Sequence, residues 1–136
     1  MRVPTKKANN DLLESIIKGM EDVKATDIVV MDMTNLSGAV CGQFVICHAN
    51  NTTQVSGIAD KIQEYTKKDL GENPWKTEGY RTAQWVILDY VNIVAHIFHK
   101  DTRSFYDLEE LWADAEIIRI SEETTEPLKV RKANRN

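Results

Sequence analysis

Residues 84–99, QWVILDYVNIVAHIFH, decide the fold of this chain. Two apolar runs flank Val91 and Asn92, a spacing typical of a β-hairpin with a two-residue loop. Such a loop predicts the cross-strand pairs Tyr90–Ile93, Asp89–Val94, Leu88–Ala95, Ile87–His96, Val86–Ile97 and Trp85–Phe98. Because successive side chains of a strand point to opposite sides, this hairpin has two different faces.

The two faces differ in polarity. The first is almost entirely apolar and predicts packing against a helix; it carries Val86, Leu88, Tyr90, Ile93, Ala95 and Ile97. The second mixes apolar with ionisable residues, which favours a contact surface for a partner; it carries Trp85, Ile87, Asp89, Val94, His96 and Phe98. The alternative is that a helix of the same chain covers this second face and that Asp89 pairs with His96.

The elements around the hairpin predict an α/β fold. Upstream, apolar spacing predicts a helix at 10–23, strands at 27–34 and 40–47, a helix after the polar cluster 50–53 that ends before Gly71, and a short strand at 76–80. Downstream, Phe105, Leu108, Leu111 and Trp112 predict one short helix. The resulting order is helix, strand, strand, helix, three strands, helix, which suits one domain (residues 1–120) with helices packed on a mixed sheet of about five strands. The first strand lacks alternation and is expected to be central, and residues 121–136 are expected to form a flexible basic tail.

The composition is that of a globular protein. The 136 residues are 42% hydrophobic and 28% charged, a balance that predicts folding by burial of one core. Charged or amide residues interrupt every apolar run, and no apolar segment follows the basic start, so we expect neither a membrane span nor a signal peptide and place the chain in the cytoplasm. Cys41 and Cys47 lie on one face of a predicted strand about 20 Å apart, too far for a disulfide, and are interpreted as reduced core residues.

The charges are unevenly distributed. The net charge is −4, but Arg2, Lys6 and Lys7 near the start and Lys129, Arg131, Lys132 and Arg135 near the end are seven positive charges. Without these seven, the body carries −4 − 7 = −11. An acidic body repels phosphate and attracts basic surfaces, so we expect a basic protein partner and restrict direct RNA contact to the tail; solubility is the alternative explanation of the charge.

The chain also resembles a known family. WVILDYVNIVAHIF, RSFYDLEELW, FVICHANNTTQVSGIADKI and IVVMDMTNLSG are similar, in order and spacing, to motifs of the ribosomal silencing factor family (RsfS, or Iojap-like proteins). The resemblance covers about residues 12–112. Trp85, Asp89 and His96 match its hairpin motif, and Tyr106, Leu108, Glu109, Leu111 and Trp112 match its terminal motif.

This resemblance implies a nucleotidyltransferase-like α/β domain that docks on a large-subunit ribosomal protein, the fourteenth in the standard series, and sterically blocks joining of the small subunit. Trp85, Ile87, Asp89, Val94, His96, Phe98, Tyr106, Glu109 and Trp112 are the expected partner-binding residues. Leu108 and Leu111 are interpreted as packing residues of the terminal helix, and self-association through the hairpin face, giving a homodimer, is left open. The chain departs from the family pattern at Gly42 and Gln43, at residues 49–51, and at Val91 and Asn92.

Catalysis is not expected. The alternative function is a nucleotide-binding enzyme of the same fold, which needs clustered carboxylates for divalent metals and a glycine-rich phosphate loop. Asp32 and Asp89 are the only strand-borne candidates, and residue Thr34 leaves no Asp-x-Asp pair. His96 and His99 have an odd separation on one strand, which sends them to opposite faces. We therefore expect no catalytic residue, no cofactor and no metal site.

Overall fold

The hairpin forms with the predicted register. The computed structural model describes residues 6–34, 42–120 and 130–132. Five of the six predicted pairs, from Trp85–Phe98 to Asp89–Val94, are paired between the two strands. At the loop, Tyr90 N donates to Ile93 O over 2.9 Å and Asn92 N donates to Tyr90 O over 3.1 Å, which closes a γ-turn around Val91. Val91 accordingly has a positive φ of 79°.

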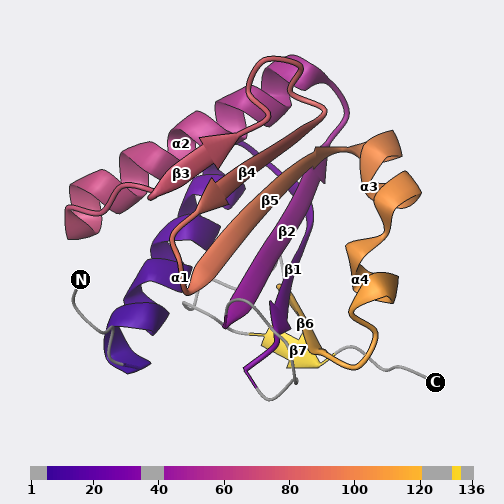
Figure 1. Ribbon diagram of the computed structural model, residues 1–136. Helices are drawn as coiled ribbons and strands as arrows, with labels where there is room; N and C mark the ends of the chain where they lie inside the picture. Colours follow the sequence, from indigo (N-terminus) through magenta and orange to yellow (C-terminus); the bar gives the residue numbers. More distant parts are fainter. Residues whose placement is uncertain (1–5, 35–41, 121–129, 133–136) are drawn as a thin grey trace.

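One sheet organises the whole molecule (Figure 1). Its strands are β1 (Thr26–Asp32), β2 (Gln43–Ala49), β3 (Lys76–Glu78), β4 (Trp85–Asp89), β5 (Ile93–His99), β6 (Glu116–Ile120) and β7 (Val130–Lys132). The helices are α1 (Lys6–Asp22), α2 (Thr52–Leu70), α3 (Lys100–Tyr106) and α4 (Leu108–Leu111). The strand order is β3-β4-β5-β2-β1-β6-β7, with β2 and β5 parallel and the other neighbours antiparallel. The predicted α/β fold with a mixed sheet and an interior first strand is confirmed, but the described residues form seven strands of the sheet where about five are predicted.

The first hairpin face packs against α1 and α2, as predicted. Both helices lie behind the sheet in Figure 1 and share one apolar core with it. That core contains Ile16 and Met20 of α1, Ile58 and Ile62 of α2, and all six first-face residues of the hairpin. Cys47 belongs to the same core, and burial raises the pKa of its thiol to about 12, so the core interpretation of this cysteine is correct; Cys41 lies outside the described residues.

The ends of α2 follow their capping residues. The Asn51 side chain accepts a hydrogen bond from Gln54 N at 2.8 Å, and Gly71 takes a left-handed conformation with φ 66° while its N–H donates to Lys67 O. Asparagine satisfies free N–H groups at a helix start and glycine adopts positive φ at a helix end without steric cost. The predicted helix after the polar cluster, ending before Gly71, is therefore confirmed.

The C-terminal third differs from the prediction. The expected single helix is two short helices, because Asp107 adopts a left-handed φ of 46° between them and its side chain accepts from Glu110 N at the start of α4. Strand β6 is missed by the sequence prediction although it pairs with the interior strand β1. Val130–Lys132, within the segment expected to be a flexible tail, pair with β6 as strand β7. The rest of 121–136 lies outside the described residues, and the domain boundary at residue 120 stays a prediction.

No helix in the described part of the chain is long and apolar enough to cross a membrane.

Candidate partner-binding site

The second hairpin face is only partly accessible. Trp85, Ile87, Asp89 and Val94 are half-buried, whereas His96 is 5% and Phe98 1% exposed. A second apolar core forms over this face from Phe44 and Ile46 of β2, Phe98 of β5 and Leu108 of α4, among others, with Trp85 and Val94 at its margin. His96 and Phe98 therefore cannot touch a partner in this conformation, and their predicted role as contact residues becomes one of supporting the exposed side chains.

The pairing of Asp89 with His96, which belongs to the alternative interpretation of this face, does not form. His96 Nδ1 instead accepts from Trp85 Nε1 at 3.0 Å, and Asp89 Oδ1 accepts from Val91 N at 2.8 Å in the hairpin loop. Burial lowers the pKa of His96 to about 3, so the imidazole is neutral near pH 7. The hydrogen bond leaves the proton of the neutral ring on Nε2, which is buried and has no hydrogen-bond partner among the described residues.

An aromatic row crosses this face of the molecule. It runs through Phe105, Tyr106, Trp85, Phe98, His96, Phe44 and Trp112. Successive ring centroids are between 4.5 and 6.4 Å apart, which is the separation of interacting aromatic pairs. The middle of the row is buried while Phe105 and Tyr106 at one end are 80% and 51% exposed, so a rigid base holds exposed rings in place.

The segment formed by α3 and α4 supplies most of the exposed apolar surface near the row. Leu108 is buried, as predicted, but Leu111 is 69% exposed, so the prediction that Leu111 packs inside is wrong. The physical reason is the break at Asp107, which rotates α4 relative to the helical phase assumed from the sequence. Phe105 and Leu111 are therefore candidates for contact with a partner. The sequence prediction placed both on the apolar side of the terminal helix.

Glu109 forms an ion pair within the molecule. Its Oε1 accepts from Nε of Arg103 at 3.1 Å, and the Arg103 side chain is 8% exposed. Arg103 Nη1 also donates to Asp27 O at 2.7 Å and contacts His48 Nδ1 at 2.9 Å. The sequence prediction missed Arg103 because arginine is rarely buried and nothing in the chain near it indicates burial.

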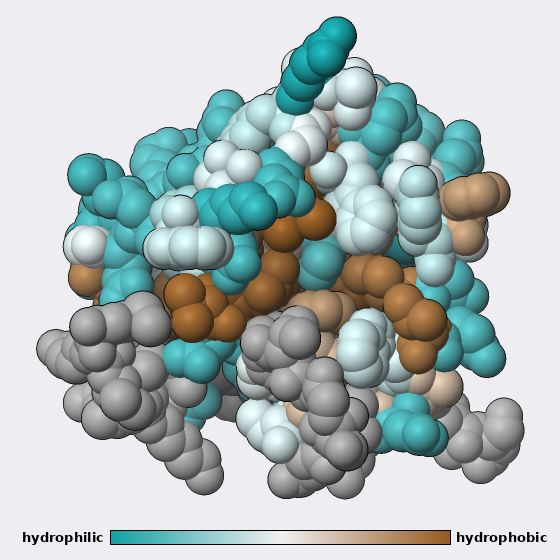
Figure 2. All heavy atoms as spheres, viewed as in Figure 1, coloured by the Kyte–Doolittle hydropathy of each residue, from teal (hydrophilic) through white to brown (hydrophobic). Residues whose placement is uncertain are grey.

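Acidic side chains outnumber the one exposed cation, Lys100, in the α3–α4 segment that carries the exposed apolar residues. Asp101, Asp107 and Glu110 of the α3–α4 segment are exposed, and Asp89 is half-buried on the hairpin. Figure 2, which views the face not covered by α1 and α2, shows hydrophobic residues across its middle, bordered by hydrophilic ones. An apolar patch with a polar, negatively charged rim is suited to a basic protein surface.

Two of the departures from the family pattern meet in space. Asn92 O accepts from Gly42 N at 2.9 Å and from Gln43 N at 3.1 Å, so the altered hairpin loop and the altered start of β2 contact one another. The third departure, residues 49–51, supplies the Asn51 cap of α2. None of these contacts involves the aromatic row.

The candidate carboxylates for metal-dependent chemistry lie apart. Asp32 is on β1 and Asp89 on β4, three strand spacings away in the order β4-β5-β2-β1, or about 14 Å, too far to share one ion. Asp32 Oδ1 accepts from Thr34 N and Oγ1 at 3.0 and 2.7 Å. Over the described ranges, no group of three or more His, Cys, Asp or Glu side chains is placed to hold a metal ion.

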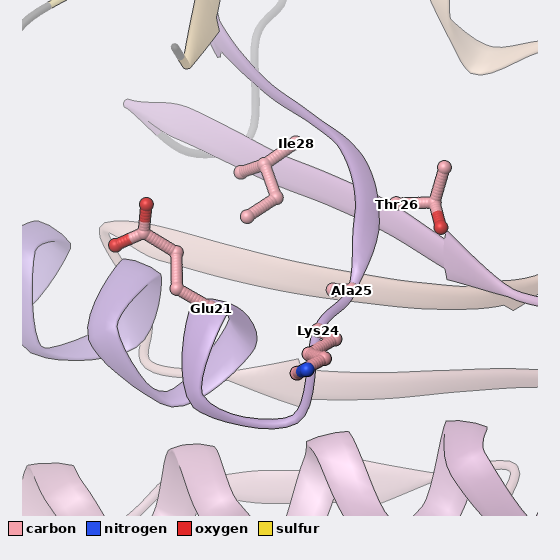
Figure 3. A pocket seen from close by; sticks show the side chains of 5 residues that line it. All are labelled: Glu21, Lys24, Ala25, Thr26 and Ile28. Atoms are coloured by element: carbon pink, nitrogen blue, oxygen red, sulfur yellow. The ribbon is translucent and has the colours of Figure 1, made fainter. Parts of the chain in front are cut away.

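A cavity of about 530 Å³ lies on the helix-covered side, between the last turn of α1 and the start of β1 (Figure 3). Its lining residues are Glu21, Lys24, Ala25, Thr26 and Ile28. One cation beside one anion does not form the cationic cradle that a triphosphate needs. The cavity therefore gives no support to the nucleotide-binding alternative.

Comparison with known proteins identifies relatives over most of the chain. The family model described as "Ribosomal silencing factor during starvation" matches residues 5–136. The ribosomal silencing factor RsfS of Halalkalibacterium halodurans is 35% identical over 113 residues, covering 83% of this chain and 95% of the relative. The RsfS of Bacillus subtilis is 40% identical over 104 residues, covering 76% and 86%.

Solved structures with the same fold agree with these relatives. A crystal structure of a Chromobacterium violaceum protein superposes with a TM-score of 0.70 at 26% identity, covering 75% of this chain and 83% of the other. A Bacillus halodurans crystal structure superposes with a TM-score of 0.68 at 36% identity, covering 76% and 95%.

Proposed function

Because this chain belongs to the ribosomal silencing factor family, we propose that it represses translation by binding the large ribosomal subunit and sterically blocking the joining of the small subunit. The observation that carries this proposal is the exposed apolar end of the aromatic row inside an acidic rim. Binding needs no reaction, so the chain acts as an adaptor and not as an enzyme.

The proposed partner is the large-subunit ribosomal protein that the family resemblance implies, the fourteenth in the standard series. Ribosomal proteins that contact RNA are basic, and complementary charge accelerates association and selects partners. The chain body, without its basic ends, carries −11, which supports a basic protein partner over bare RNA.

The proposed docking face combines the hairpin and the α3–α4 segment. It consists of Trp85, Ile87, Asp89, Val94, Phe105, Tyr106, Leu111 and Trp112, all of which are at least partly exposed. Aromatic side chains held rigidly lose little entropy on binding and are enriched among residues that dominate interface energies. The buried rings of His96 and Phe98 hold Trp85, which is stacked 4.8 Å from Phe98, and Asp89 supplies charge at the hairpin end.

The test is co-sedimentation with purified large subunits, combined with a subunit-joining assay. Tyr106→Ser and Leu111→Ser remove exposed apolar surface without opening a core, so the double variant should fold and should bind at least tenfold more weakly. Asp89→Asn removes the charge and keeps an oxygen for the 2.8 Å bond to Val91 N, so it should weaken binding without unfolding the loop.

The matched control is Leu70→Ser. Leu70 is 37% exposed and is the last residue of α2, which lies on the other side of the sheet from the docking face (Figure 1), so its loss should leave binding and joining unchanged. Wild-type inhibition of joining by the folded Tyr106→Ser, Leu111→Ser variant would show that the docking face is wrongly assigned. If light scattering shows that this variant converts a dimer to a monomer while ribosome binding persists, the face is a self-association surface instead.

A further inference from the structure

The α3–α4 segment has a small apolar attachment to the rest of the molecule. Leu108 is its buried apolar side chain, and Tyr106 adds a ring contact with Trp85 at 4.8 Å. Phe105 and Leu111 point largely to solvent. A segment this short has little helical stability of its own and needs tertiary contacts to stay in place.

A buried guanidinium provides the polar attachment. Arg103 Nη1 makes two contacts from α3 to the sheet: one with the Asp27 carbonyl oxygen of β1 at 2.7 Å, the other with His48 Nδ1 of β2 at 2.9 Å. Nε donates to Glu109 of α4 at 3.1 Å. One side chain thus connects α3 to two strands and to the following helix.

The backbone around Asp27 is shaped for this contact. Asp27 has a positive φ of 51°, and the pairing of β1 with β2 shifts register between Thr26 and Val29. At this irregularity the Asp27 carbonyl accepts from Arg103. The Asp27 carboxylate pairs with Arg119 of β6 at 2.7 Å and lies 3.7 Å from Arg103 Nη2. A non-glycine residue with positive φ costs free energy that the surrounding contacts must offset.

We propose that Arg103 is a positioning residue, which holds the α3–α4 segment in its binding-ready place and does so only while His48 is neutral. The proposal rests on the proposed function, because the segment carries Phe105, Tyr106 and Leu111 of the docking face. Arginine donates and cannot accept, so His48 Nδ1 must offer a lone pair to form the 2.9 Å contact. A protonated His48 would face Arg103 with a second positive charge and no acceptor.

The charges around His48 come from four elements. Arg103 and Lys100 lie on α3, Asp27 on β1 and Glu109 on α4, and Arg119 of β6 neutralises part of the Asp27 charge. Burial, then Arg103, lowers the pKa of His48 below its usual 6.5, with Asp27 and Glu109 acting in the opposite direction. The attachment is therefore complete at neutral pH and weakens as pH falls below about 6.5.

The experiment measures hydrogen exchange and ribosome binding separately. Protection of the amides of α4 against exchange reports how firmly the α3–α4 segment is attached. One such amide is Trp112 N, which donates to Leu108 O at 3.0 Å. Protection of the α2 amides reports the stability of the rest of the fold. Arg103→Met should lower α4 protection and large-subunit affinity each about tenfold at pH 7.5, with α2 protection unchanged. Arg81→Met, which removes an exposed cation from the turn before β4, is the control and should change neither.

The pH profile distinguishes positioning from a merely structural role. On moving from pH 7.5 to pH 5, wild-type α4 protection should fall several-fold after correction for intrinsic exchange. His48→Gln supplies an acceptor that does not titrate and should make this change clearly smaller. The response that remains in the variant is the contribution of His96, whose burial lowers its pKa to about 3.

Two results would overturn the proposal: wild-type α4 protection in folded Arg103→Met, or a pH response in His48→Gln equal to that of wild type. The exchange data test the role of Arg103 and His48 even if the wild-type chain fails to bind large subunits. A failure to bind would contradict the proposed function and not the proposed attachment.

Discussion

At the scale of single residues, Val91 carries backbone strain in the hairpin loop. Its φ of 79° is in the left-handed region, where a β-branched side chain is crowded and glycine is not. The Asp89 side chain partly offsets this strain by accepting from Val91 N at 2.8 Å. The register is therefore set by the strands on either side and not by the loop residues.

Val91→Gly should stabilise the protein by about 0.5–1 kcal/mol, because relief of strain exceeds the added entropy of the unfolded chain. Urea denaturation measures this change. Asn92→Gly, at a neighbouring position without positive φ, should instead destabilise; a loss of stability in Val91→Gly would show that the loop is not strained.

His96 couples the stability of the second core to pH. It is neutral in the folded protein because burial lowers its pKa to about 3, whereas an exposed histidine titrates near 6.5. The unfolded chain therefore binds more protons between these two values, and the contribution of His96 is complete above pH 6.5 and is lost as pH falls toward 3.

We expect this histidine to add up to about 1.4 kcal/mol per pH unit to the slope of unfolding free energy in that range. Urea denaturation at several pH values should show a shallower slope for His96→Gln than for wild type. NMR of the folded protein provides the direct check, since a His96 imidazole that titrates near pH 6.5 would contradict its burial.

At the scale of elements, α1 and α2 approach one another closely at Gly19. A Cβ on Gly19 would lie 2.6 Å from the Cα of Ile62 and 2.9 Å from its N. Both atoms belong to the α2 backbone, which cannot move aside as a flexible side chain can. The glycine therefore permits the packing that covers the first face of the sheet.

Gly19→Ala should destabilise the protein by about 1–3 kcal/mol despite the better helix propensity of alanine. Gly57→Ala is the matched control, because its Cβ would meet only Val23 Cγ1 at an ordinary 3.8 Å, and it should stabilise by about 0.5–1 kcal/mol. Thermal or urea unfolding of both variants measures the contrast, and equal effects would show that the helix contact is not tight.

Elements also differ in how well they could be predicted. The hairpin and α2 were predictable, since alternation, apolar spacing and the residues Asn51 and Gly71 are local signals. The division of the terminal helix at Asp107 and the pairing of β6 with β1 were not. The pairing of β6 joins it to a strand that is distant in sequence, and the left-handed conformation of Asp107 is one that few residues other than glycine adopt.

At the scale of the whole molecule, net charge and its distribution determine how the chain meets a partner. Seven positive charges lie at the two ends and the remaining body is strongly acidic. Attraction between exposed charges is screened over about 10 Å at 0.1 M salt. Binding that depends on this attraction should respond to ionic strength.

Affinity for large subunits should fall several-fold when salt rises from about 0.05 M to about 0.3 M. Co-sedimentation at both concentrations measures how steeply the affinity depends on salt. Asp89→Asn should reduce this dependence. Glu14→Gln on α1, across the sheet from the docking face, should leave it unchanged. An affinity that is independent of salt would mean that apolar contact alone drives binding.

The sequence by itself determined the α/β class, the register of the hairpin and the core face shared with α1 and α2, because each follows from alternation or spacing between near neighbours. Only the tertiary structure decided which second-face residues reach solvent. His96 and Phe98 are buried by β2 and α4, while Leu111 becomes exposed. It also decided that Arg103 lies inside, since its contacts with Asp27 and His48 join residues 76 and 55 positions apart. Whether these side chains are buried depends on which elements cover them in the assembled molecule, and the alternation within one strand does not determine that.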